Sequence, residues 1–272
     1  MKVTILFTGL CLSFFNMHSK AQNHISVKVG KKIHAVNNSL STITQTSMGQ
    51  EMIAKSDVTI DIDVEVKQTI PDILLSLKIS RLQLKTDVLG KKSDFDSDKS
   101  EDRNEQIGQV LAPVIGKSFD ILLNTASELN KVASSSDQST EAAKSLLQNF
   151  DKLPRELMLA MPATINKGDT WSEYNTTDEE NKVRIDYNVV SLTNTMSTLL
   201  FKGIAISKAN KIVQGMDALV TSSSNFVGEL IVDIKSGIIK TKKSTIETKG
   251  TTEIIGHCLP FTIKSTMTTN SK

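Results

Sequence analysis

The clearest pattern in the sequence is a strict alternation of apolar and polar residues from Val58 to Lys67. Successive side chains of a β-strand point to opposite faces, so this pattern predicts a strand with one dry face and one solvated face. After a turn at Pro71-Asp72, alternation continues to Ile79 but resumes at Leu82 one residue out of phase, which predicts a β-bulge near Ser80-Arg81. The dry face of the first strand would carry Val58, Ile60, Ile62, Val64 and Val66.

Further strands are expected on both sides of a central region. Apolar positions alternate from Val183 to Val189 and again from Leu230 to Lys235. A turn at Gly237 follows, where glycine suits the left-handed position of a hairpin loop. We also expect extended structure at 25–50, 119–124, 129–132, 198–207, 238–248 and 252–269, and irregular structure at 208–223.

Two segments have the apolar spacing of amphipathic helices. One covers 103–115, and the other covers 137–161, where Pro162 ends it and Trp171 then opens a new strand. The sequence therefore predicts a mainly β (α+β) fold. We expect a large, curved antiparallel sheet, of half-barrel shape, with two helical segments packed on one face.

Residues 1–21 have the features of a signal peptide. Lys2 precedes a short apolar segment, and small residues at Ser19 and Ala21 occupy the positions that signal peptidase requires. The apolar segment is too short to span a bilayer comfortably. A lipid anchor at Cys11 is the alternative, although Leu10 stands where a small residue is expected. We therefore expect an exported protein, periplasmic or secreted, with no transmembrane span after cleavage.

The rest of the chain is expected to form a single β-rich domain. This domain would cover 22–272, in two halves at 22–133 and 163–272 that the helical segment 137–161 joins.

Charge argues against nucleic acid as a partner. The chain has 32 Lys and Arg against 30 Asp and Glu, and the signal peptide contains Lys2, Lys20 and no acidic residue. Cleavage therefore leaves a formally neutral chain, whereas binding to phosphates requires a basic surface. Cleavage also leaves Cys258 as the sole cysteine, which we interpret as a buried structural thiol.

Three residues in the central region form a candidate ligand-binding surface. Met158, Met161 and Trp171 are large and apolar, and methionine side chains adapt to varied ligands. The alternative is that all three are core residues, because buried aromatic side chains mostly serve packing.

An acidic loop at 93–102 resembles a calcium-binding pattern. Asp94, Asp96, Asp98 and Glu105 fall at positions 1, 3, 5 and 12 of such a loop. However, Lys99 occupies the position that requires glycine, and its ammonium group would oppose a cation. Calcium is thus the one cofactor that the sequence suggests, and a solvated loop whose aspartates cap a helix is the alternative.

Catalytic motifs are not evident in the sequence. His24, His34 and His257 match no zinc spacing and are interpreted as surface or boundary residues. There is no Gly-x-Ser-x-Gly elbow and no glycine-rich phosphate loop. We therefore predict that the protein is not an enzyme.

Short motifs resemble a family of secreted bacterial proteins typical of the Bacteroidota, to which no function is assigned. They are the block from Lys167 to Trp171, the Asp96-Ser97 pair and the segment from Asp233 to Gly237. The resemblance would cover most of the chain, and Glu128 departs from the glycine expected in an earlier hairpin. It implies an exported β-rich protein and no catalytic residues.

Two functions fit these expectations. The first is an apolar-ligand or lipid-binding module of the cell envelope, whose ligand lies between a concave sheet and the helices. The second is a structural or protein-interaction module with a fully packed core. They differ in whether the dry face from Val58 to Val66 is filled by side chains or lines a cavity.

Overall fold

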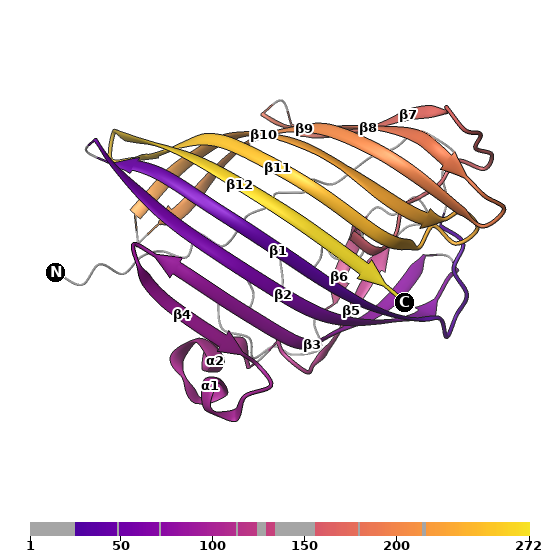
Figure 1. Cartoon of the computed structure of the whole chain (residues 1–272), viewed down its shortest axis with the longest axis horizontal. Coiled ribbons are helices and arrows are strands. Elements are labelled where there is room, and N and C mark those ends of the chain that lie inside the picture. Colours follow the sequence, from indigo (N-terminus) through magenta and orange to yellow (C-terminus); the bar gives the residue numbers. More distant parts are fainter. Residues whose placement is uncertain are drawn as a thin grey trace.

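The computed structural model describes residues 25–47, 49–70, 72–112, 114–123, 129–133, 156–178, 180–213 and 216–272. Twelve strands form a single antiparallel sheet, which is long and strongly curved (Figure 1). Two short helices lie beside it. The predicted fold class, a large curved antiparallel sheet with helical segments on one face, is confirmed. The predicted signal peptide and residues 137–155 of the predicted helix lie outside the described residues.

The strands are long, as strict alternation over many residues requires. The first half of the chain forms β1 (Lys32–Ser47), β2 (Gln50–Gln68), β3 (Ile73–Val88), β4 (Lys91–Asp96), β5 (Ser118–Leu123) and β6 (Leu129–Ala133). The second half forms β7 (Thr170–Asp178), β8 (Asn181–Leu192), β9 (Met196–Val213), β10 (Met216–Asp233), β11 (Ile239–Ile254) and β12 (His257–Ser271).

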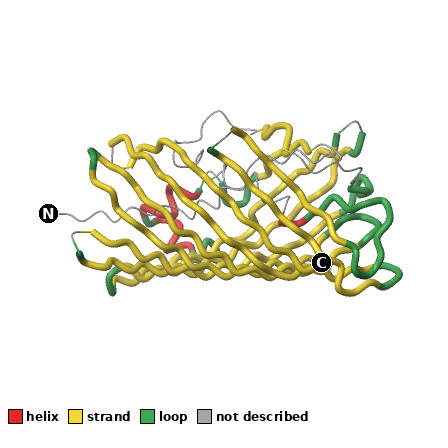
Figure 2. The backbone as a smooth tube through the Cα atoms, turned by 90° about the horizontal axis from the view of Figure 1, so that it is seen from above, coloured by secondary structure: helices red, strands yellow, loops and turns green. Residues whose placement is uncertain are grey.

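The first and last strands pair at the centre of the sheet. The strand order is β6-β5-β3-β2-β1-β12-β11-β10-β9-β8-β7, and β4 pairs with β3 outside this path. β1 runs against β12 from the Ala35–Ser271 pair to the Gln45–Phe261 pair. As a result β6 and β7 lie at opposite ends of the sheet, and the chain between them must lead from one end to the other. In the view from above, the sheet forms an open trough (Figure 2).

Alternation on β2 and β3 is as expected from the sequence. Ile62, Val64 and Val66 are buried on the inner face of the trough, and Val58 and Ile60 are half-buried. The predicted bulge is confirmed, because Asp61 pairs with Arg81 whereas Ile62 pairs with Ile79, which leaves Ser80 without a partner residue in the ladder. We call the face that carries these buried residues the inner face.

Three apolar clusters cover the inner face. The first cluster joins β1, β2, β3 and β5, and the second joins β8 to β12. The third contains Leu82, Phe95 and Leu111, against which Ile107 packs. Its helical members come from α2 (Gln106–Leu111), which follows α1 (Ser100–Asn104).

Four expectations for local structure were wrong. The predicted helix 137–161 does not extend to its expected end, because Met158 forms an isolated β-bridge with Ile238 and residues 159–161 are not helical. The described residues of the region 208–223 belong to the hairpin of β9 and β10, because those from 208 to 213 and from 216 to 223 have ladder partners on the neighbouring strand. The segment 252–269 is divided between β11 and β12, since Ile255 and Gly256 both take positive φ and form a hairpin turn. The helix at 103–115 is two short helices, because Glu105 between them has an extended backbone, with φ −71° and ψ 163°.

Among the described residues, no helix combines the length and the apolar character needed to cross a membrane.

Candidate functional site

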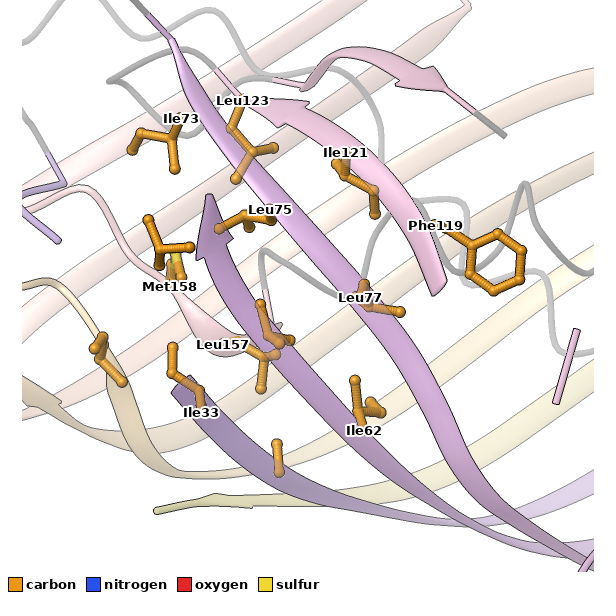
Figure 3. Packing of buried hydrophobic residues seen from close by; sticks show 14 of the residues in the cluster. Ile33, Ile62, Ile73, Leu75, Leu77, Phe119, Ile121, Leu123, Leu157 and Met158 are labelled. Atoms are coloured by element: carbon orange, nitrogen blue, oxygen red, sulfur yellow. The ribbon is translucent and has the colours of Figure 1, made fainter. Parts of the chain in front are cut away.

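The inner face of the trough is the candidate site, and one half of it is filled. The filling element is residues 156–161, which we call the connecting segment because it lies on the path from β6 to β7. Leu157, Met158 and Ala160 belong to the first cluster, and Leu159 and Met161 belong to the second. Figure 3 shows Leu157 and Met158 among the buried side chains of β1, β2, β3 and β5. The connecting segment therefore joins the two halves of the sheet through the core.

A hairpin loop holds the connecting segment in place. Leu159 donates its backbone N–H to the carbonyl oxygen of Gly237 at 2.8 Å, and Met158 forms an isolated β-bridge with Ile238. Gly237 has a φ of 74°, which confirms the predicted left-handed position. A Cβ at Gly237 would also overlap the carbonyl oxygen of Leu159. This second requirement for glycine involves a contact that sequence patterns do not show.

A buried ion pair also anchors the connecting segment. The Lys242 Nζ lies 2.8 Å from Glu156 Oε2, and their side chains are only 16% and 8% exposed. Lys242 Nζ is also 5.5 Å from the centre of the Phe201 ring, within the range of a cation–π contact. Two charges on a face otherwise made mostly of apolar and hydroxyl side chains are costly unless they stay paired. Sequence analysis did not identify either residue as part of a site.

Trp171 lies at the edge of the second cluster. Its ring stacks on Tyr187 with 5.1 Å between ring centres, and its Nε1 is buried without a hydrogen-bond acceptor. The Tyr187 hydroxyl donates to Glu173 Oε2 at 3.3 Å. The structure thus places Trp171 and Met161 in one cluster and Met158 in another. Ligand binding by these three residues remains a prediction.

Little space is left between the connecting segment and the sheet. A cavity of about 40 Å³ is lined by Leu159, Tyr187, Phe201 and Lys242, among other residues of the second cluster. One water molecule occupies at least ~10–15 Å³ on this measure, so the cavity holds a few waters at most. A lipid chain does not fit in this half, which we call the filled half.

The other half of the inner face is less covered, and we call it the open half. Ile263, Ile43, Ala54 and Val88 are cross-strand neighbours on β12, β1, β2 and β3. All four are half-buried, as is Phe261 on the same face of β12. The open half therefore presents a continuous row of apolar side chains that retain access to solvent.

Glycines make room for aromatic rings on the inner face. A Cβ at Gly203 would overlap the ring of Phe226, and one at Gly228 would lie 2.5 Å from the ring of Phe201. A Cβ at Gly250 would lie 2.5 Å from the ring of Phe261. Each phenylalanine thus covers a glycine on the neighbouring strand, which protects the strand backbone at that glycine.

A larger hollow, of about 890 Å³, lies on the outer face. Its residues occur in consecutive threes on six neighbouring strands, such as Leu40, Ser41 and Thr42 on β1. Within each three the middle side chain points to the inner face, as the buried Ser41 and Ser265 show. The walls are therefore the outward side chains, and most of these are lysines, acidic residues and threonines. We interpret this hollow as a solvated groove.

The acidic loop contains an ion pair at its centre. Asp96 is buried and accepts hydrogen bonds from Arg81 Nη2 at 2.6 Å, Arg81 Nε at 3.1 Å and Gln83 Nε2 at 3.0 Å. The Arg81 guanidinium holds the pKa of Asp96 well below its usual range, although burial opposes this shift. Asp98 lies 3.3 Å from Arg81 Nε, and Asp102 accepts the backbone N–H of Asp96 at 2.7 Å.

Two of the predicted calcium ligands, Asp96 and Asp98, lie together around Arg81. The other two lie apart from them: Asp94 is exposed on β4, and Glu105 lies between the two helices. In the described part of the chain, no three carboxylate, histidine or cysteine groups are placed to hold a metal ion. Calcium binding remains a prediction. Calorimetry tests it, and the absence of heat at millimolar calcium would contradict it.

The histidines and the cysteine lie near the surface. His34 Nδ1 is 2.8 Å from Asp63 Oδ1, and both side chains are about half exposed. His257 is exposed, and His24 lies outside the described residues. The interpretation of Cys258 as a buried thiol was wrong. Cys258 is exposed, because it points outward at the start of β12, directly after a hairpin turn.

A comparison with protein-family models finds no match, and a comparison with curated protein sequences finds none. Among solved structures, the chain is similar to lipovitellin, in a structure that describes lipid–protein interactions. The TM-score is 0.57, with 14% identity over 91% of this chain. The chain spans only 25% of the length of lipovitellin. An outer membrane channel from Pseudomonas putida F1 matches with a TM-score of 0.27 and 8% identity over 94% of this chain and 100% of the channel. The likeness to lipovitellin concerns the fold alone, and the channel match carries no argument.

Proposed function

We propose that this protein is exported and binds an apolar ligand or lipid, without enzymatic activity, on the inner face of its sheet. The observation that carries this proposal is the unequal filling of the trough. The connecting segment packs the filled half, whereas the open half keeps a row of partly exposed apolar side chains from Ile263 to Val88. Export is supported by the signal-peptide pattern at residues 1–21.

Covering the open half would be favourable. Apolar surface removed from water contributes roughly 25 cal/mol per Å², and connected apolar surface on a concave face is typical of ligand sites. The ligand would lie along the row formed by Ile43, Ala54, Val88 and Ile263, with Phe261 at one side. The glycine beneath Phe261, Gly250, leaves the ring close to the sheet.

Fold similarity supports the same proposal by analogy. The solved structure of lipovitellin concerns its lipid–protein interactions, and a quarter of that chain is similar in fold to this one. Fold alone does not determine function, so this support is weaker than the arrangement of the side chains.

Native mass spectrometry and dye titration test the proposal. Gently purified protein should carry an apolar adduct, and delipidated protein should take up a fluorescent hydrocarbon or fatty acid. In Ala54→Asp, a carboxylate enters the apolar row, so we expect at least ~10-fold weaker uptake, since burial of an unpaired charge is unfavourable. Ile53→Asp is the matched control, because the neighbouring Ile53 is on the outer face and 42% exposed. Absence of both adduct and uptake, or equal losses in the two variants, would contradict the proposal.

The packing of the filled half favours the second candidate, a structural or protein-interaction module of the cell envelope. Met158 and Met161 are each only 2% exposed, and the cavity beside them is small. Crosslinking in cells distinguishes the two functions. A specific protein partner, together with no ligand uptake by the delipidated protein, would support the interaction module.

A further inference from the structure

The outer face of β7 to β10 carries large apolar side chains that the core does not use. We call this set of side chains the outer patch. Their exposed fractions lie between 44% and 56%, and the residues are Tyr174, Leu200, Ile204, Ile206 and Val227. On the same strands, inward residues such as Phe201 and Phe226 fill the second cluster. Folding therefore does not require the apolar character of the outer patch.

The strand register makes the outer patch continuous. Leu200, Ile204 and Ile206 point outward along β9. Val227 on β10 pairs with Lys202, which stands between Leu200 and Ile204 on the same face. Tyr174 on β7 reaches the patch through Arg184, because Arg184 pairs with both Tyr174 and Ile204. Exposed and connected apolar side chains of this kind mark interaction surfaces.

Basic side chains are interleaved with the apolar ones. Lys182 pairs with Ile206, Lys202 pairs with Val227, and the Arg184 guanidinium lies 5.2 Å from the centre of the Tyr174 ring. Long basic side chains rest their methylene groups on apolar surface and extend their charge outward. Tyrosine with an apolar ring and a polar hydroxyl suits the boundary between lipid and water.

Two acidic residues adjoin the outer patch. Asp186 is bound by Arg184 Nε at 2.8 Å and by the Ser172 hydroxyl at 2.6 Å, so its charge is largely compensated. Glu229 pairs with Leu200 at the border of the patch. Asp186 also pairs with Lys202 on β9. Lys182, Arg184 and Lys202 outnumber these two carboxylates, which gives the surface around Ile204 a net positive charge.

The shape of the surface selects the type of partner. The outer patch lies on the face opposite to the second cluster, on strands that are neighbours in the curved sheet (Figure 1). No residue of the patch lines any of the hollows described above. An exposed sheet face with interleaved lysines, outside these hollows, does not enclose a peptide or a small molecule, but it can rest on a flat bilayer. Anionic headgroups attract the lysines, at about 1 kcal/mol for each basic residue near the surface.

We propose that the outer patch docks this protein on an anionic lipid bilayer. This inference rests on the outer face and is independent of ligand binding on the inner face.

Sedimentation with vesicles tests the docking site. The protein should sediment with phosphatidylcholine–phosphatidylglycerol vesicles more than with pure phosphatidylcholine vesicles, and added salt should release it. The Ile204→Glu/Val227→Glu variant should lose at least ~10-fold in vesicle affinity. Leu40→Glu is the matched control, because Leu40 is 54% exposed on the outer face of β1 and Ile204 is 52% exposed. The Lys182→Gln/Lys202→Gln variant should weaken binding to anionic vesicles only.

Dye uptake on the inner face separates this inference from the proposed function. The outer-patch variant should take up dye as the unmodified protein does, which also shows that it is folded. Failure of the unmodified protein to sediment with anionic vesicles would overturn the proposal, as would an equal loss in Leu40→Glu. A self-association that Ile204→Glu/Val227→Glu abolishes, without vesicle binding, would assign the patch to a second copy of the chain and also overturn it.

Discussion

The backbone amide of Leu159 donates a 2.8 Å hydrogen bond to the carbonyl oxygen of Gly237, and this bond joins the connecting segment to the loop between β10 and β11. A second contact joins the same two residues, because the carbonyl oxygen of Leu159 occupies the space that a Cβ on Gly237 would need. The hairpin loop and the connecting segment thus fit each other at a single glycine. The packing of the filled half depends on this fit.

Gly237→Ala should destabilise the protein by about 2–4 kcal/mol. Part of the loss comes from the left-handed conformation, at about 1 kcal/mol, and the rest comes from overlap with the Leu159 carbonyl. Gly256→Ala is the control, since Gly256 has the same φ of 74° but no atom within 4 Å of its added Cβ. Urea unfolding measures both variants. Equal losses would show that the Leu159 contact has no energetic role.

Removing one charge of the Glu156–Lys242 pair should destabilise the folded protein more than removing both charges. Glu156→Gln removes the carboxylate charge that Lys242 Nζ contacts at 2.8 Å in a mostly apolar environment, and we expect a loss of about 3–5 kcal/mol. The Glu156→Leu/Lys242→Met variant should recover most of this loss, because neither charge then needs to leave water. Thermal unfolding of the single and double variants measures the difference. As a control, Lys249→Gln removes a charge that is 73% exposed and should change stability by less than ~0.5 kcal/mol.

Gly203→Ala should destabilise the second cluster by about 1–3 kcal/mol. The new methyl group would overlap the Phe226 ring and would lie 2.6 Å from the backbone oxygen of Arg184. A double-mutant cycle with Phe226→Leu separates these contacts. If the ring is the main obstacle, Gly203→Ala should cost less in the Phe226→Leu background. An unchanged cost would place the obstacle at the β8 backbone.

Acid should weaken the contact between β3 and the acidic loop. Arg81 lowers the pKa of Asp96 in the folded protein, so this carboxylate stabilises the fold at pH values above its unfolded pKa of about 3.9. That contribution is lost as the pH falls from about 4 towards the lower folded pKa. Asp96→Asn should therefore reduce stability at neutral pH, and the stability of this variant should decrease less steeply as the pH falls below ~4.

Urea unfolding between pH 7 and pH 2 measures the Asp96 effect. Asp98→Asn is the control, because Asp98 is 54% exposed and contacts Arg81 at the longer distance of 3.3 Å. A decline with acid that is as steep in Asp96→Asn as in the unmodified protein would contradict the role assigned to the Arg81–Asp96 pair.

Sequence patterns predicted the parts of this fold that depend on near neighbours. The alternation from Val58 to Val66 identified a strand and its inner face, because the side-chain period of a strand is local. The phase change at Ser80 identified the bulge, and Gly237 identified the hairpin turn, for the same reason. The region 208–223 was missed because its apolar and polar residues do not alternate regularly. Strands of this kind are stabilised by their ladder partners more than by their own pattern.

The candidate site was predicted less well, because it depends on contacts between distant residues. Met158, Met161 and Trp171 were recognised as apolar and close in sequence. In the connecting segment, the Met158 side chain points into the first cluster and the Met161 side chain into the second. Periodicity over a few residues cannot indicate this difference. The open half, from Ile263 to Val88, was not recognised as a site, since its members come from four strands that are far apart in the chain.

By itself, the sequence determined an antiparallel β protein, the residues of β2, β3 and β8 that face the core, and the turn that needs glycine at Gly237. These features follow from steric rules that act over two to five residues. Tertiary structure decided that β1 pairs with β12, that the connecting segment fills one half of the trough, and that Glu156 meets Lys242 inside it. Such contacts join residues that the whole chain must bring together, and their energies depend on burial and register that no local pattern records.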